Sequence, residues 1–114
     1  MPIKRRSAKQ KATRGQNELR VKLLQNFPQL EPDDVVCAVG SQNGCDIKLS
    51  PAARQIIRYS FEVKYREKLN IWEALDQAEN NTIPNTDPAV VFKRNRSETF
   101  IALKLDDFLK LIKK

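Results

Sequence analysis

One stretch of the sequence decides the predicted fold: Tyr59-Ser60-Phe61-Glu62-Val63-Lys64-Tyr65. Apolar or aromatic side chains alternate with polar ones, which is typical of a β-strand with a side-chain period of two. Glu62 and Lys64 then share one face of the strand, about 7 Å apart. The aromatic residues and Val63 share the other face.

A second alternating stretch, Cys45-Asp46-Ile47-Lys48-Leu49, precedes it by a few residues. Here Asp46 and Lys48 share a polar face, and the three other side chains share an apolar one. If the two strands are neighbours, Asp46 joins Glu62 and Lys64. Two carboxylates and one lysine on a common sheet face suit a Mg²⁺ site.

Composition limits the chemistry that this chain of 114 residues can perform. It contains no histidine and two cysteines, which excludes histidine-based nucleophile activation and argues against a zinc site. No apolar run approaches the roughly 20 residues of a membrane helix, and the N-terminus lacks the apolar core of a secretory signal. Free thiols in apolar strands fit a reducing cytoplasm, so we expect a cytoplasmic protein without a membrane partner.

The net charge of +7 is concentrated at the N-terminus. Residues 1–22 contain eight basic residues and one acidic residue, whereas residues 23–114 contain 13 of each. Such a basic segment favours a polyanionic partner, with nucleic acid as the leading candidate and a solvated tail as the alternative. A second basic cluster follows at 93–96. The residues expected to contact nucleic acid are Lys4, Arg5, Arg6, Lys9, Lys11, Arg14, Lys93, Arg94 and Arg96.

The remaining patterns predict a basic arm at 1–12, expected to be flexible, and a single domain at 13–114. A capping box at Thr13 predicts a helix to about Phe27, and an Asn70 cap predicts a helix to about Asn80. Helical spacing of Leu105, Phe108, Leu109 and Ile112 predicts a last helix with a buried apolar stripe. Strands are expected at 35–39, 45–49, 59–65, 89–92 and 99–103. The order αβββαββα predicts an α/β fold with a mixed five-stranded sheet flanked by helices.

The spacing of Asp46 and Glu62-Val63-Lys64, 16 residues apart, resembles the motif of the PD-(D/E)XK nuclease superfamily. Gly15-Gln16-Asn17-Glu18-Leu19 resembles the first helix of archaeal- and phage-type Holliday-junction resolvases. Gln77-Ala78-Glu79 resembles the superfamily's glutamine-containing fourth motif. The segment 72–79 is similar to small phage-encoded members. Cys45 departs from the proline that often precedes the aspartate in this family.

The resemblance implies a restriction-endonuclease-like fold and a Mg²⁺-dependent endonuclease that resolves branched DNA, with Mn²⁺ able to substitute. Glu18, Asp46, Glu62 and the Val63 carbonyl would hold the metal, and Lys64 and Gln77 would complete the catalytic set with Asp46 and Glu62. Ser41 matches a polar DNA-contacting loop. A homodimer acting in the host cell's cytoplasm, encoded by a phage or mobile element, is also implied.

Simpler interpretations stay open beside these. Glu62 and Lys64 also fit a surface pair on an exposed sheet, and Glu18 fits an ion pair with Arg14 or Lys22 on one helix face. Gln77 fits an ordinary exposed position, and Ser41 an ordinary turn. The alternatives for function are a nuclease of the same fold with another DNA or RNA target, a non-catalytic nucleic-acid-binding module, and a basic structural protein.

Overall fold

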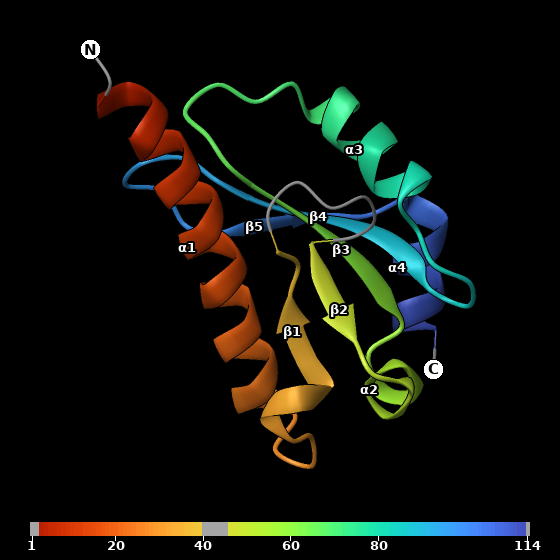
Figure 1. Ribbon diagram of the computed structural model, residues 1–114. Helices are drawn as coiled ribbons and strands as arrows, with labels where there is room; N and C mark the ends of the chain where they lie inside the picture. The colour runs from red at the N-terminus through yellow and green to blue at the C-terminus, as the bar shows by residue number, and fades with distance from the viewer. Residues whose placement is uncertain (1–2, 40–45, 114) are drawn as a thin grey trace.

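A three-stranded sheet forms the centre of the computed structural model, which describes the backbone of residues 3–39 and 46–113 and the side chains from residue 9 onward within them (Figure 1). Its middle strand β4 (Asp87–Lys93) pairs in parallel with β3 (Tyr59–Tyr65) and antiparallel with β5 (Phe100–Ala102). A parallel pair needs a crossover connection, and α3 (Ile71–Asn80) lies within it, as predicted.

A separate two-stranded sheet contains β1 (Val35–Cys37) and β2 (Ile47–Leu49), paired antiparallel as the sequence predicts. The five expected strands are therefore present, but the prediction of one five-stranded sheet is wrong. The residue after β2 is bonded to the residue before β1: the Ser50 N–H donates to the Asp34 carbonyl at 2.9 Å. The Ser50 hydroxyl also donates to the Asp34 carboxylate at 2.6 Å. The Ser50 side chain also caps α2 (Pro51–Ile56), which follows β2 directly.

Helix α1 (Ile3–Asn26) begins ten residues earlier than the Thr13 cap predicted, so the segment 3–12 is helical. Strong helix formers dominate this segment and neither proline nor glycine interrupts it, which lets the helix run through Thr13. The predicted stripe of Leu19, Leu23, Leu24 and Phe27 does pack on the hydrophobic core.

Helices cover both faces of the three-stranded sheet. On one face Phe61, Ala89 and Val91 belong to a core that α1 and the β1–β2 sheet complete. On the other face, Val90 packs with Ala74 and Ala78 of α3. Since Glu62 is paired with Val90 in the strand register, the Glu62 face is the one that α3 covers.

The last helix, α4 (Leu105–Ile112), departs from its prediction. Its apolar residues were expected to be buried, but each is exposed, and the one buried residue of the helix is Asp107. On the side of α4 that carries Asp107, the Lys110 ammonium lies 3.3 Å from the Asp107 carboxylate and 3.4 Å from that of Asp87 in β4. A 3-10 turn, η1 (Pro32–Asp34), precedes β1. No helix in the described ranges is long and apolar enough to span a membrane.

Candidate metal centre and nucleic-acid surface

Asp46 lies where the two sheets meet, and three hydrogen bonds fix its position. Its N–H donates to the Phe61 carbonyl at 3.0 Å, and its carbonyl accepts from the Ala38 N–H at 2.8 Å. One carboxylate oxygen accepts from the Val63 N–H at 2.7 Å. The chain therefore holds this carboxylate against the middle of β3, beside the predicted Glu62 and Lys64.

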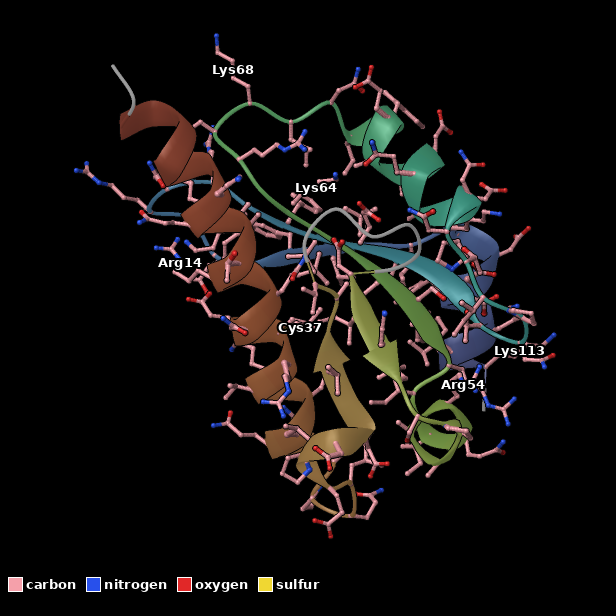
Figure 2. The ribbon with its side chains drawn as sticks, in the orientation of Figure 1. Arg14, Cys37, Arg54, Lys64, Lys68 and Lys113 are labelled. Carbon is pink, nitrogen blue, oxygen red and sulfur yellow. The ribbon has the colours of Figure 1, made fainter. Side chains whose placement is uncertain are left out.

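Glu62 and Lys64 form a buried ion pair. The Lys64 Nζ lies 3.2 Å from the Glu62 Oε2, and the two side chains are 11% and 8% exposed. The other oxygen, Glu62 Oε1, is buried and has no hydrogen-bond partner among the described residues. Buried polar atoms without partners are rare and costly, so this oxygen is suited to accept a ligand. Lys64 is labelled in Figure 2.

The pKa of the Asp46 carboxyl depends on its burial and on the same neighbours. Burial is the main cause that raises the pKa of the Asp46 carboxyl above its usual value. The Val63 N–H lowers this pKa, the Glu62 carboxylate raises it, and the Lys64 ammonium lowers it. A divalent cation between Asp46 and Glu62 would offset both the burial of charge and the repulsion between carboxylates.

The oxygen donors available here match magnesium in kind. In an extended strand the N–H and the carbonyl of one residue project toward the same edge, so the Val63 carbonyl faces the Asp46 side of β3. Two carboxylates and a carbonyl are hard ligands of the type that Mg²⁺ takes, with water completing its shell. Across the described part of the chain, however, no three acidic, cysteine or histidine side chains converge on one point.

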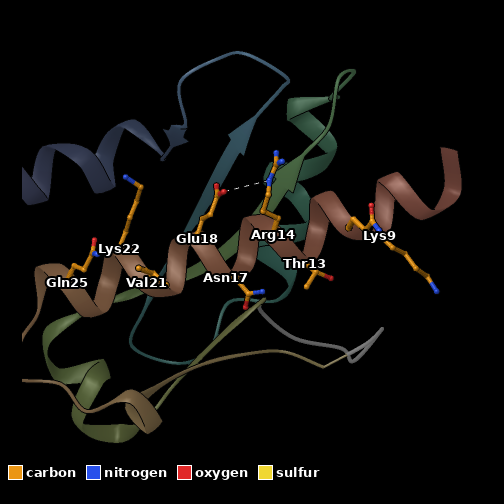
Figure 3. A pocket seen from close by; sticks show the side chains of 9 residues that line it. Lys9, Thr13, Arg14, Asn17, Glu18, Val21, Lys22 and Gln25 are labelled. Atoms are coloured by element: carbon orange, nitrogen blue, oxygen red, sulfur yellow. Dashed lines mark ion pairs between the residues drawn. The ribbon is translucent and has the colours of Figure 1, made fainter. Parts of the chain in front are cut away.

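Glu18 does not join the Asp46 and Glu62 carboxylates. It accepts a hydrogen bond from the Tyr65 hydroxyl at 2.8 Å and lies 3.6 Å from the Arg14 guanidinium. Figure 3 shows Arg14 and Glu18 paired along α1. Because Tyr65 projects from the face of β3 opposite to Glu62, the sheet separates Glu18 from the Glu62 carboxylate. The helix ion pair that the sequence offered as an alternative is present.

Gln77 lies on the same side of the sheet as Glu62, but its side chain is not part of the candidate site. Its helix α3 covers the Glu62 face, yet the Gln77 side chain is exposed. Its backbone carbonyl accepts from the Asn81 N–H at 3.0 Å, at the end of α3. No bond within the described structure links its side chain to Asp46, Glu62 or Lys64.

Two basic segments that are far apart in the sequence meet in space. Side chains from the α1 helix and from the β4–β5 turn line one shallow depression together with residues that follow β3. Glu67 connects them, because its carboxylate accepts from the Asn95 N–H at 2.6 Å and lies 3.6 Å from the Lys11 ammonium. The basic side chains that line the depression are Lys11, Arg14, Arg66, Lys93 and Arg94.

The remaining residues that were predicted to contact nucleic acid lie in different places. Lys93 folds back into its own turn, donating to the Ser97 carbonyl at 2.7 Å, and Arg96 supplies a positive φ of 64° there. A second depression, of about 710 Å³, runs along α1 and includes Lys9 and Arg14 but none of the Asp46, Glu62 and Lys64 side chains. The side chains of Lys4, Arg5 and Arg6, and the whole of Ser41, lie outside the described residues.

Sequence reasoning missed the structural roles of Gly15 and Tyr65. A Cβ atom at Gly15 would lie 2.8 Å from Tyr65 Cδ1 and 2.9 Å from Val63 Cγ1, so glycine permits α1 to pack closely on β3. The Arg14 guanidinium lies 5.8 Å from the centre of the Tyr65 ring. A glycine inside a helical pattern was the available signal for this close approach.

The chain matches no protein-family model, no curated protein and no solved structure in comparisons with each.

Proposed function

We propose that this protein is a Mg²⁺-dependent DNA endonuclease of the PD-(D/E)XK type that acts on branched DNA. The observation that carries the proposal is that Asp46, bonded to the Val63 N–H, lies near enough to the Glu62–Lys64 pair for both to shift its pKa, while Glu62 Oε1 is buried and unpartnered among the described residues. Without histidine in the chain, carboxylates, lysine and bound water are the main groups left for hydrolysis.

Each group has a distinct task in this proposal. Asp46, Glu62 and the Val63 carbonyl would hold Mg²⁺, which supplies an activated water and neutralises charge on the scissile phosphate when bound. Lys64 orients the attacking water and stabilises the negative charge that develops on the phosphate. Its ion pair with Glu62 at 3.2 Å positions the ammonium before substrate arrives. Mn²⁺ is expected to substitute, because it accepts the same oxygen donors.

Support for a DNA substrate comes from the basic surface formed by α1 and the β4–β5 turn. Lys11 and Arg94 lie close together there although more than 80 residues separate them in the sequence. Lysine and arginine side chains bind the phosphate backbone without reading sequence. Preference for four-way junctions, and action in a host cell's cytoplasm, follow from the resemblance of the sequence to resolvases.

Cleavage of a labelled four-way junction, compared with a matched linear duplex in Mg²⁺, tests the proposal. We expect junction cleavage by the wild-type protein and a loss of at least about 100-fold in Glu62→Ala and Lys64→Ala. Lys104→Ala is the matched control, because Lys104 forms an exposed ion pair with Glu79 at 3.1 Å. Wild-type protein that never cleaves would exclude a nuclease. Site variants that cleave as the control does would exclude Glu62 and Lys64 as the active site. Equal cleavage of junction and duplex would retain the nuclease and exclude the junction preference.

One observation favours a second candidate, a non-catalytic nucleic-acid-binding module. Lys64 already neutralises Glu62, and Glu18 lies across the sheet instead of completing a three-carboxylate site. Under this alternative the wild-type protein binds DNA tightly in Mg²⁺ without cutting any substrate, and Glu62→Ala leaves binding unchanged. A binding assay run beside the cleavage assay separates the two functions.

A further inference from the structure

A pocket lies at one end of the three-stranded sheet, where β3 and β4 end and β5 begins. Its volume is about 480 Å³, which is within the usual range of ligand pockets. We call it the Phe100 pocket. Charged side chains from the segment after β3 and from the β4–β5 turn form its margin. Four apolar residues form its walls: Leu69, Ile71, Phe92 and Phe100.

The strand register places this pocket beside Lys64. Lys64 is paired with Phe92, and Phe92 is paired with Phe100, so the three residues form one row across the sheet. They share a face of the sheet, because Phe92 packs in the same apolar cluster as Val90, the strand partner of Glu62. With about 4.8 Å between neighbouring strands, Phe100 lies about 10 Å from Lys64. The Phe100 pocket therefore borders the candidate metal centre.

Two aromatic rings form a stacking surface in the pocket. The ring centres of Phe92 and Phe100 are 5.9 Å apart, and their planes are inclined by 29°. Phe92 is partly buried in the cluster that α3 completes, whereas Phe100 is 54% exposed. A ring that is supported by a second ring and still half exposed is the kind of surface on which proteins stack nucleobases. Because every base has a π-face, such a surface accepts bases of any sequence.

The charges at the margin of the pocket favour a nucleotide over a purely apolar ligand. The Glu67 carboxylate is paired with Lys11, and the Lys93 ammonium is bonded within its own turn. The guanidinium groups of Arg66 and Arg94 are exposed and belong to no ion pair among the described residues. Two cations therefore outnumber the one remaining carboxylate. The charged residues of the margin are Arg66, Glu67, Lys93, Arg94 and Glu98.

The Phe100 pocket is continuous with the basic surface formed by α1 and the β4–β5 turn. Figure 1 shows this turn beside α1. A phosphate backbone that lies on the basic surface can pass over the end of the sheet and bring a base into the pocket. Four residues line both the pocket and the shallow depression on that surface: Arg66, Glu67, Lys93 and Arg94.

We propose that the Phe100 pocket binds one unpaired nucleobase at the branch point of the DNA, while Arg66 and Arg94 hold the adjacent phosphates. An unpaired base enters such a pocket most readily, because no base pair has to be opened. The distance of about 10 Å to Lys64 equals about three steps of 3.4 Å along a stacked strand, so cutting takes place within a few nucleotides of the bound base. The inference rests on the DNA substrate of the proposed function and deepens it, because it names the feature of branched DNA that is recognised.

Fluorescence anisotropy with two labelled four-way junctions tests the pocket. The junctions are identical except that one has two unpaired thymidines at the branch point. Ca²⁺ replaces Mg²⁺, and a gel verifies that the DNA stays intact. The wild-type protein should bind the junction with unpaired thymidines at least about fivefold more tightly, which corresponds to the weaker end of base stacking on an aromatic ring. Phe100→Ala should abolish this preference, and Phe100→Trp should retain it.

The neighbouring residue on β5 supplies a matched control. Ile101 is 54% exposed, as Phe100 is, but it projects from the opposite face of the strand. Ile101→Ala should therefore keep the preference for unpaired thymidines. Every variant should bind the fully paired junction within about twofold of wild type, because that binding depends on phosphate contacts alone. This second measurement also verifies that the variants are folded.

The outcomes separate the pocket from the nuclease. Equal affinity of the wild-type protein for both junctions would overturn the pocket, as would a preference that Phe100→Ala retains or that Ile101→Ala also loses. Cleavage in Mg²⁺ is measured on the same DNA, so these results leave the nuclease intact. A protein that prefers unpaired thymidines through Phe100 but never cuts in Mg²⁺ would retain the pocket and exclude the nuclease. A wild-type protein that binds neither junction would exclude both.

Discussion

Removal of Lys64 should destabilise the protein far more than removal of an ordinary surface lysine. Lys64→Met keeps most of the side-chain volume but leaves the Glu62 carboxylate buried, with Oε1 unpartnered and Oε2 deprived of its ion pair at 3.2 Å. Breaking a buried pair in this way costs about 3–5 kcal/mol of unfolding free energy. Chemical denaturation followed by far-ultraviolet circular dichroism measures it. Trp72 fluorescence would respond weakly, because that side chain is 76% exposed.

The chain contains a matched control for this experiment. Lys104 and Glu79 are separated by 3.1 Å, almost the same distance, but their side chains are 50% and 57% exposed. Lys104→Met should therefore cost less than about 1 kcal/mol. The contrast between the two lysines isolates burial as the cause, since distance and chemistry are held constant.

A double-mutant cycle completes the test. In Glu62→Met/Lys64→Met neither charge of the buried pair remains, so the stability of this variant should return to near that of wild type or exceed it. A cost below about 1 kcal/mol for Lys64→Met would refute the reasoning, because Glu62 and Lys64 would then be the exposed surface pair that the sequence also allowed. A double variant as unstable as Lys64→Met would likewise exclude the unpaired carboxylate as the cause.

Three further perturbations follow from the described geometry. Gly15→Ala should lower the unfolding free energy by about 1–2 kcal/mol in denaturant titrations, because a Cβ 2.8 Å from Tyr65 outweighs the gain in helix propensity. Burial raises the Asp46 pKa in the folded state, so the stability that this group contributes is present below its usual 3.8 and is lost as pH rises through the raised value. Asp46→Asn should hence be more stable than wild type at pH 7, with the difference vanishing below pH 3.8, in thermal melts across pH. Lys11→Ala and Arg94→Ala should each reduce the salt dependence of DNA binding by about one phosphate contact in anisotropy titrations.

Local signals explain why much of the fold was predictable. Strand β3 was predicted with its observed bounds, because strict alternation over seven residues has few alternatives. The Asn70 side chain accepts from two backbone N–H groups at the start of α3, as its position in the sequence indicated. The start of α1 was wrong because the capping pattern at Thr13 competes with ten preceding residues of high helix propensity.

Proximity within the candidate site was predictable only where backbone periodicity controls it. Glu62 and Lys64 share a face because side chains alternate. Asp46, just before β2, reaches β3 through its hydrogen bonds with Phe61 and Val63. The position of Glu18 depends instead on which side of the sheet α1 occupies. That choice is made by tertiary packing at Gly15, and spacing along the sequence contains no information about it.

Helix α4 shows that the spacing of apolar residues predicts which of them share a helix face, but not whether that face is buried. The spacing of Leu105, Phe108, Leu109 and Ile112 correctly implies that these residues share a face, and burial of such a face is the usual reason for the pattern. The pattern does not specify whether the covering surface belongs to the same chain. Here the chain attaches α4 through Asp107 and Lys110 and leaves the apolar face outward. The spacing of the stripe therefore determines which residues share a side of α4, but not whether that side is buried within the chain.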